Sequence, residues 1–361
     1  MGLNEALLAK AAEAKLLRSH RVRADTTVVC ANVAYPTDSG LLAKAIRRIG
    51  ATAKRIQAAG GATRTRLRDR SRAAGKRAHA IASKLRSRAA VGRDEAKSAV
   101  LASTGELAEL AHTATREAQR LLANAQQALR RAKAKAVELR ARGGCDAAAG
   151  RRRGRLARAV NDLHKLLDAT RHIVVQARQR LAGQTPDRAT RRVSLHDPDA
   201  RPIAKGRLGR PVEFGHKAQV VDNDDGIVLD HSLEQGNPAD APQLAPAVQP
   251  VTKRTGRTPR TVTADRGPGE AKLDHPLTDL GVTNVVIPRK GKPSQTRQAH
   301  EHRKAFRRHI KWRTGSEGRI SYLKRGYGWD RTRTDTTEIA RIWTGHGVLA
   351  HNLVKISALA A

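Results

Sequence analysis

The sequence has little cysteine, few aromatic residues and no long apolar run. Only Cys30 and Cys145 are present, which excludes a disulfide framework and a cysteine zinc site and indicates a reducing compartment. No run of about eighteen apolar residues occurs, so no transmembrane helix is expected. The N-terminus lacks a signal-peptide core and carries Ala6 where a myristoylation signal needs Ser or Thr. These absences predict a soluble cytoplasmic protein without a membrane partner.

Acidic residues are also scarce. Asp and Glu number 33 against 70 Lys and Arg, which gives a formal net charge of +37. A charge this far from zero exceeds what solubility requires, so it predicts a polyanionic partner, with nucleic acid as the default candidate. In a cell we therefore expect association with the nucleoid.

One of the few acids, Asp25, lies in a segment typical of a strand. The segment from Val22 to Tyr35 is rich in Thr and Val, Pro36 ends it, and Thr37 can cap a following helix. A carboxylate within an apolar strand is costly unless it is paired or bound to a metal. Asp25 is therefore a candidate functional residue, and the alternative is an edge-strand Asp that faces water.

A long helical region separates this strand from the rest of the chain. Between Leu41 and Gly183 the sequence is rich in Ala, Arg, Leu and Lys, with breaks at Gly60, near Gly92 and at Gly143. Small and apolar residues recur at intervals of three and four, which predicts antiparallel helical arms with basic outer faces. The arms could serve DNA contact, dimerisation or mere spacing. A linker from Gln184 to Leu208 is expected to follow.

Shorter elements follow the linker. The pattern predicts a hairpin with an Asp-Gly turn and a short strand that ends on an acid, Asp265. The remaining expected elements are a helix at Gln243–Thr252, a strand at Val282–Pro288, a helix at Gln295–Arg308 and a closing helix at Trp343–Leu359.

The segment from Trp312 to Arg331 places one acid, Glu317, among basic residues. A helix that starts near Ser316, capped by its hydroxyl, puts Glu317 in the first turn and Lys324 two turns further on the same face. Arg313 precedes the acid by four residues. Such a carboxylate can bind a divalent cation while the basic side chains hold a nucleic acid. The alternative is a solvated helix with a surface charge pair.

This order of strands, helices and acids is that of a ribonuclease H-like domain, and several motifs resemble the insertion-sequence DDE transposases. The resemblance covers the first forty residues and the chain after about Lys205. It rests on these segments: Ala24–Val29, Tyr35–Ser39, Gly209–Val212, Gly236–Asp240, Thr263–Gly267, Val286–Gly291, Trp312–Lys324 and Gly345–Lys355.

The resemblance implies an α/β fold with a mixed ribonuclease H-like sheet flanked by helices and interrupted by a long all-α, coiled-coil-like insertion. Residues 1–40 would begin the catalytic domain, residues 41–204 would form the basic helical arm and linker, and residues 205–361 would complete the catalytic domain.

The resemblance also implies a site. Asp25, Asp265 and Glu317 would be the catalytic and metal-binding acids, holding two Mg²⁺ ions, with Mn²⁺ as an alternative ion. The expected activity is phosphodiester cleavage and strand transfer on double-stranded DNA, both element terminal repeats and target, by a homo-oligomer. The basic residues expected to contact DNA are Arg313, Lys324, Arg266, Arg319, Lys290 and Arg325.

Some features depart from the family pattern. Ile310 stands where a Tyr is expected, Pro268 follows the Arg-Gly after the second acid, and only about two dozen residues precede Asp25. One alternative is therefore a shortened, inactive relic that acts only as a basic DNA-binding protein. Another is a ribonuclease H-like nuclease without strand transfer.

Other residues are weaker candidates for the same chemistry. Asp222 and Asp230 are the alternatives for the first acid if the strand at Val22 does not join the sheet. Cys30 and Ser321 are poor candidates for a covalent nucleophile, because no His and acid accompany either of them at a suggestive spacing.

Overall fold

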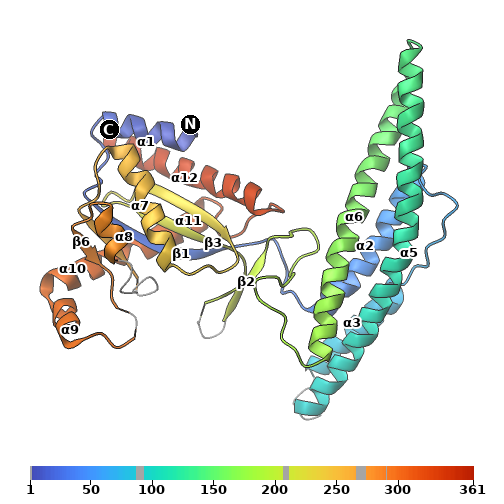
Figure 1. The fold of residues 1–361 in the computed structure, drawn as a ribbon, viewed down its shortest axis with the longest axis horizontal. Helices are drawn as coiled ribbons and strands as arrows, with labels where there is room; N and C mark the ends of the chain where they lie inside the picture. The colour runs from blue at the N-terminus through green and yellow to red at the C-terminus, as the bar shows by residue number, and fades with distance from the viewer. Residues whose placement is uncertain (1, 87–92, 206–210, 266–273, 290) are drawn as a thin grey trace. The chain divides into compact units, whose positions relative to one another are not determined.

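A computed structural model describes residues 2–86, 93–205, 211–265, 274–289 and 291–361. The chain divides into two compact units (Figure 1). The first unit combines Met1–Asn32 with Asp199–Ala361, and the second is the intervening segment, Val33–Pro198.

The first unit is built on a mixed six-stranded sheet. Strand β1 lies between β3, to which it is antiparallel, and β5, to which it is parallel. Strand β6 continues the parallel edge, while β2 and β4 both pair with β3. The strands are β1 (Arg21–Cys30), β2 (Arg201–Ala204), β3 (Val212–Asp222), β4 (Val228–Gln235), β5 (Thr261–Ala264) and β6 (Asn284–Val286).

Helices cover both faces of this sheet. Because side chains alternate along a strand, Val22 and Ala24 of β1 pack into one apolar cluster and Val29 into another. The first cluster includes side chains from α1, α7 and α8, and the second includes side chains from α11 and α12. The helices are α1 (Leu3–Glu13), α7 (Ala241–Thr255), α8 (Asp274–Asp279), α9 (Gln295–His302), α10 (Lys304–Arg313), α11 (Gly315–Gly326) and α12 (Thr337–Ala360). The expected α/β fold with flanking helices is confirmed.

Helix α12 holds the β3–β4 hairpin through two buried side chains. Asn352 accepts a hydrogen bond from the Val228 backbone N–H at 2.9 Å and donates one to the Val228 carbonyl at 2.8 Å. His351 contacts the Gly226 carbonyl at 2.9 Å, and Gly226 has the positive φ, 74°, that the predicted Asp-Gly turn requires. His351 therefore has a structural role in this unit.

The second unit is helical. It contains α2 (Asp38–Ala58), α3 (Ser71–Arg86), α5 (Arg93–Ala141) and α6 (Ala147–Leu181). Thr37 caps α2 as expected, accepting from the Gly40 N–H at 3.1 Å. In α5 the small and apolar residues at intervals of three and four form a seam that is buried from Leu107 to Ala125, whereas Ala128 and Ala132 are only half-buried.

The structure corrects several expected boundaries. The first strand ends at Cys30 rather than Tyr35. Strand β2 lies in the segment expected to be a linker, and the helix expected at Gln295–Arg308 is two helices, because Arg303 adopts an extended backbone between them. The break near Gly92 falls outside the described residues. None of the helices in the described ranges combines the length and apolar content that crossing a bilayer needs.

Candidate active site

Asp25 lies in the middle of the central strand. It stands opposite Val220 of β3 and points to the sheet face that α11 covers, because it shares the alternation of Val29. Its Oδ1 accepts a hydrogen bond from the Thr26 N–H at 2.7 Å, and its side chain is 15% exposed. The alternative of an edge-strand carboxylate facing water is therefore wrong.

Asp265 follows β5 directly and comes beside Asp25. In the parallel pairing of β1 and β5, Ala24 stands opposite Ala264, so the next residue of each strand is one of the two acids. Both carboxylates line a small pocket of about 40 Å³, together with Gln219 and Asp240. The register of two neighbouring strands thus brings together acids that are far apart in the sequence.

Arg313 links the first acid to the third. Its Nη1 donates to Asp25 Oδ2 at 3.3 Å, and its Nη2 donates to Glu317 Oε1 at 3.1 Å. Glu317 lies in the first turn of α11, as expected, and its side chain is 65% exposed. Arg313 itself is buried at the end of α10. The guanidinium therefore occupies the space between two of the three predicted metal ligands.

The pKa of Asp25 is raised to about 6. Burial is the main cause, and the nearby carboxylates of Asp265 and Glu317 raise it further. The Thr26 N–H and Arg313 oppose the shift. An ionised Asp25 is therefore costly here unless more positive charge is supplied, which a divalent cation would do.

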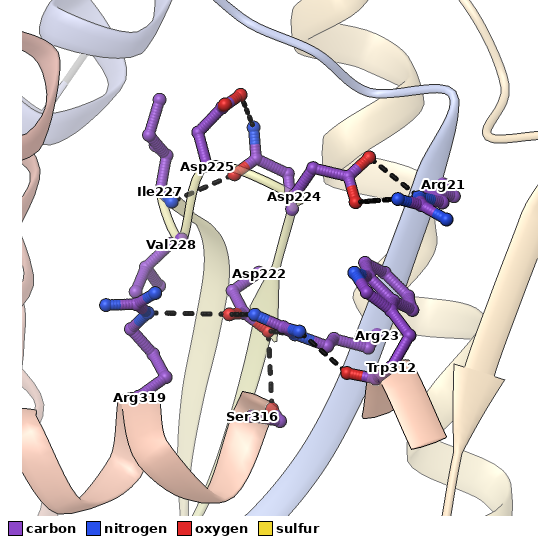
Figure 2. A network of polar contacts seen from close by, with 12 residues as sticks. Arg21, Arg23, Asp222, Asp224, Asp225, Ile227, Val228, Trp312, Ser316 and Arg319 are labelled. Carbon is purple, nitrogen blue, oxygen red and sulfur yellow. Dashed lines mark hydrogen bonds and ion pairs between the residues drawn. The ribbon is translucent and has the colours of Figure 1, made fainter. Parts of the chain in front are cut away.

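A buried network positions α11 against the sheet (Figure 2). Asp222 is fully buried and accepts two hydrogen bonds from Arg23, at 2.9 and 2.8 Å. It also accepts from Ser316 Oγ at 3.3 Å and from Arg319 Nε at 3.4 Å. Ser316 and Arg319 flank Glu317, so the acid's helix is anchored on both sides of it. The expectation that Ser316 caps the helix is wrong, because α11 begins at Gly315 and the hydroxyl is turned to Asp222.

Trp312 is held by two arginines (Figure 2). The guanidinium carbons of Arg21 and Arg23 each lie 4.7 Å from the centre of its ring. Arg23 also donates to the Trp312 carbonyl at 2.8 Å, and a Cβ at Gly315 would collide with its guanidinium. Since Trp312 directly precedes Arg313, these contacts also fix the place of the bridging arginine.

Comparison with known proteins identifies a family. A family model described as the transposase DDE domain matches residues 168–353, just over half of the chain. The chain belongs to this transposase family. It matches no curated protein and no solved structure. The matched range includes Asp265 and Glu317, whereas Asp25 lies before it.

The other predicted DNA contacts lie in different surroundings. Lys324 and Arg325 lie in the last turn of α11, half-buried and exposed respectively. Arg319 is turned inward to Asp222. Arg266 and Lys290 lie outside the described residues, as does Pro268. The role of the basic residues in DNA contact remains a prediction.

The alternative first acids occupy other positions. Asp222 lies in the buried network with Arg23, Ser316 and Arg319. Asp230 pairs with Arg254 at 3.1 Å, and burial is the main reason that the pKa of Asp230 is raised to about 6. Asp222 and Asp230 are alternatives only if the strand at Val22 does not join the sheet. That strand is β1, which lies inside the sheet, so the condition is not met.

Asp240 is a further acid beside the site. It lines the pocket of Asp25 and Asp265 and pairs with Lys217 at 2.6 Å. From the sequence, Asp240 is one of the competing acids after the hairpin, at the end of the Gly236–Asp240 segment that carries part of the family resemblance. The structure places it directly before α7.

The site offers the oxygen ligands that Mg²⁺ prefers, carboxylates of acids on neighbouring elements. In the described part of the chain, however, no three His, Cys, Asp or Glu side chains converge closely enough to form a metal cluster. Arg313 instead pairs with Asp25 and Glu317. The residue types and the raised pKa of Asp25 fit a divalent cation, provided that Arg313 moves.

Proposed function

We propose that the transposase cuts and joins the ends of a DNA element by metal-dependent phosphodiester hydrolysis and strand transfer. Asp25, Asp265 and Glu317 are its catalytic, metal-binding carboxylates. The observation that supports this most is the placement of Asp25 and Asp265 beside one pocket, with Arg313 joining Asp25 to Glu317.

The proposal includes a ribonuclease H-like sheet. Its support is the arrangement of the acids, one in central strand β1 and one directly after neighbouring strand β5. On this proposal the helical unit, Val33–Pro198, is an insertion between the first and second acids.

The three carboxylates would hold the ions. When bound, two Mg²⁺ ions, or Mn²⁺ in their place, would activate the attacking oxygen and stabilise the leaving 3′ oxygen. Arg313 neutralises Asp25 and Glu317 in the free site and, once displaced, can pair with the phosphate of the bound strand. Lys324 and Arg325, with Arg266 and Lys290 as further expected contacts, hold the duplex backbone. A homo-oligomer would bring two element ends together.

A cleavage assay tests the proposal. The transposase is incubated with Mg²⁺ and supercoiled DNA that carries candidate element ends, with Asp265→Asn as the matched variant. We expect nicking and end-joining that the variant lacks. Nicking without joining would instead support a ribonuclease H-like nuclease, and DNA retardation without cleavage would support an inactive DNA-binding relic.

A further inference from the structure

The far end of the long helical hairpin carries a dense positive charge. We call residues 130–155, the end of α5, the turn and the start of α6, the distal hairpin. It has only two acids, Glu138 and Asp146. The α5 side and the turn carry Arg130, Arg131, Lys133, Lys135, Arg140 and Arg142. The α6 side carries Arg151, Arg152, Arg153 and Arg155.

Several basic side chains nearer the core of the same unit have acidic partners. Arg70 pairs with Glu117 at 2.6 Å, and Arg178 pairs with Glu109 at 2.8 Å. Within the described ranges, by contrast, no basic side chain of the distal hairpin forms an ion pair. All of them are exposed except Arg153, which is half-buried. The charge of the distal hairpin is thus not neutralised by the chain itself.

The distal hairpin also contributes little to the apolar core of the helical unit. The apolar core of the helical unit reaches Ala125 in α5 and Leu156 in α6, and no residue between 130 and 155 is buried. The two helices leave a gap of about 370 Å³, lined in part by Ala132, Ala136 and Gly150. Mutual repulsion of the basic side chains therefore works against this segment, with little burial to offset it.

The start of α6 is already capped by an acid. Asp146 accepts a hydrogen bond from the Ala149 N–H at 2.9 Å, so the helix N-terminus is not itself offered as an anion site. Beyond this cap, Arg151, Arg152 and Arg153 follow one another without an acid between them. A bound anion would relieve their mutual repulsion.

We propose that the distal hairpin is a second DNA-binding site, separate from the candidate active site, that grips the phosphate backbone of duplex DNA. The choice of DNA among polyanions rests on the proposed function. The distal hairpin contains no Asn, Gln, Ser or Thr, so its polar contacts with DNA would come from Arg and Lys, the side chains that most often contact phosphates. We expect binding that depends strongly on salt and little on sequence.

Charge-neutral variants of the full chain test this site. The first changes Arg130, Arg131, Lys133 and Lys135 to Gln, which preserves helix propensity. The matched control removes the same charge from exposed positions near the core, Lys44, Arg47, Arg48 and Arg120. Binding to a short duplex of random sequence is measured in EDTA by fluorescence anisotropy, and helical content is compared by circular dichroism.

We expect the distal variant to bind at least about tenfold more weakly, with a salt slope lower by about 0.9 for each phosphate that its side chains no longer neutralise. The control should bind within about twofold of the unmodified chain. Equal weakening in both variants, or wild-type binding by the distal variant, overturns the proposal. Preference for single-stranded RNA over the duplex overturns it as well.

The two proposals can fail separately. If the chain never cleaves DNA but the distal variant still binds more weakly, the proposed chemistry fails and the second site stands.

Discussion

Arg23 and Asp222 face each other across the β1–β3 pair and form a bidentate ion pair with both partners buried. The two residues are 199 positions apart in the sequence. Because Asp222 also bonds Ser316 and Arg319, this pair connects the centre of the sheet to the helix that carries Glu317.

Asp222→Asn should destabilise the sheet unit strongly. It leaves Arg23, whose side chain is 7% exposed, without a countercharge, and breaking such a pair typically costs about 3–5 kcal/mol. All three tryptophans, Trp312, Trp329 and Trp343, lie in this unit, so tryptophan fluorescence during urea unfolding reports on it alone.

Glu234→Gln is the matched control for Asp222→Asn. It breaks an exposed pair with Arg341, so we expect a loss of stability below about 1 kcal/mol. Similar losses in the two variants would contradict the structural role of the buried pair.

Asp25→Asn should stabilise the sheet unit at neutral pH. The pKa of Asp25 is raised from 3.8 to about 6, so the folded state binds this proton more tightly than the unfolded chain does. The contribution of Asp25 to the free energy of unfolding is therefore highest below pH 3.8, the pKa of this residue in the unfolded chain. It falls as pH rises through about 6, by about 3 kcal/mol at most. The variant should lack this loss, so the two unfolding free energies should differ above pH 6 and converge near pH 4. Equal pH dependence would refute the burial of this charge.

Mg²⁺ should stabilise the folded sheet unit through Asp25, whereas ionisation of Asp25 without a cation destabilises it. Above pH 6 the ion should raise the melting temperature of the unmodified chain, because it binds the ionised carboxylate of the folded site. Asp25→Asn should show little response. Titration with Mn²⁺ provides the same comparison with an alternative ion, and an unchanged response in the variant would exclude Asp25 as a ligand.

Arg313→Gln should shift the pH dependence of metal binding upward. Arg313 lowers the pKa of Asp25, so its removal leaves a pKa further above the ordinary range. Half-maximal stabilisation by Mg²⁺ should then occur at a higher pH than in the unmodified chain. Lys324→Gln, two turns along α11 from Glu317, is the control and should leave the midpoint in place. An unshifted midpoint in Arg313→Gln would mean that the arginine does not act on Asp25.

Asn352→Ala should loosen the β3–β4 hairpin. The change leaves the buried N–H and carbonyl of Val228 without their partner, at a cost of about 2–3 kcal/mol. Hydrogen exchange at the Val228 amide should accelerate with it. The neighbouring His346→Ala, at an exposed position, should change neither quantity.

Local patterns predicted much of this protein. Pro36 and Thr37 mark the start of α2, the Asp-Gly turn marks the hairpin, and the seam from Leu107 marks the helical unit. These signals are local because caps, turns and amphipathic faces depend on residues within a few positions of one another. The acids Asp265 and Glu317 stand out in the same way, one at a strand end and one in the first turn of a helix.

Other features required the folded chain. The extended backbone at Arg303 splits a predicted helix, and β2 forms in a supposed linker because β3 offers it an edge to pair with. The sequence position of Ser316 is typical of a helix N-cap, yet its hydroxyl donates a hydrogen bond to Asp222. For β2 and Ser316 a distant partner outweighed the local preference.

The sequence by itself determined the family resemblance, the basic charge and the candidate acids, because motifs and composition are properties of short segments. Only the tertiary structure decided that Asp25 and Asp265 share a pocket and that Arg313 stands between Asp25 and Glu317. The physical reason is register. Which side chains meet across β1, β3 and β5 depends on strand pairing over long sequence separations, and a slip of one residue would turn Asp25 to the opposite face.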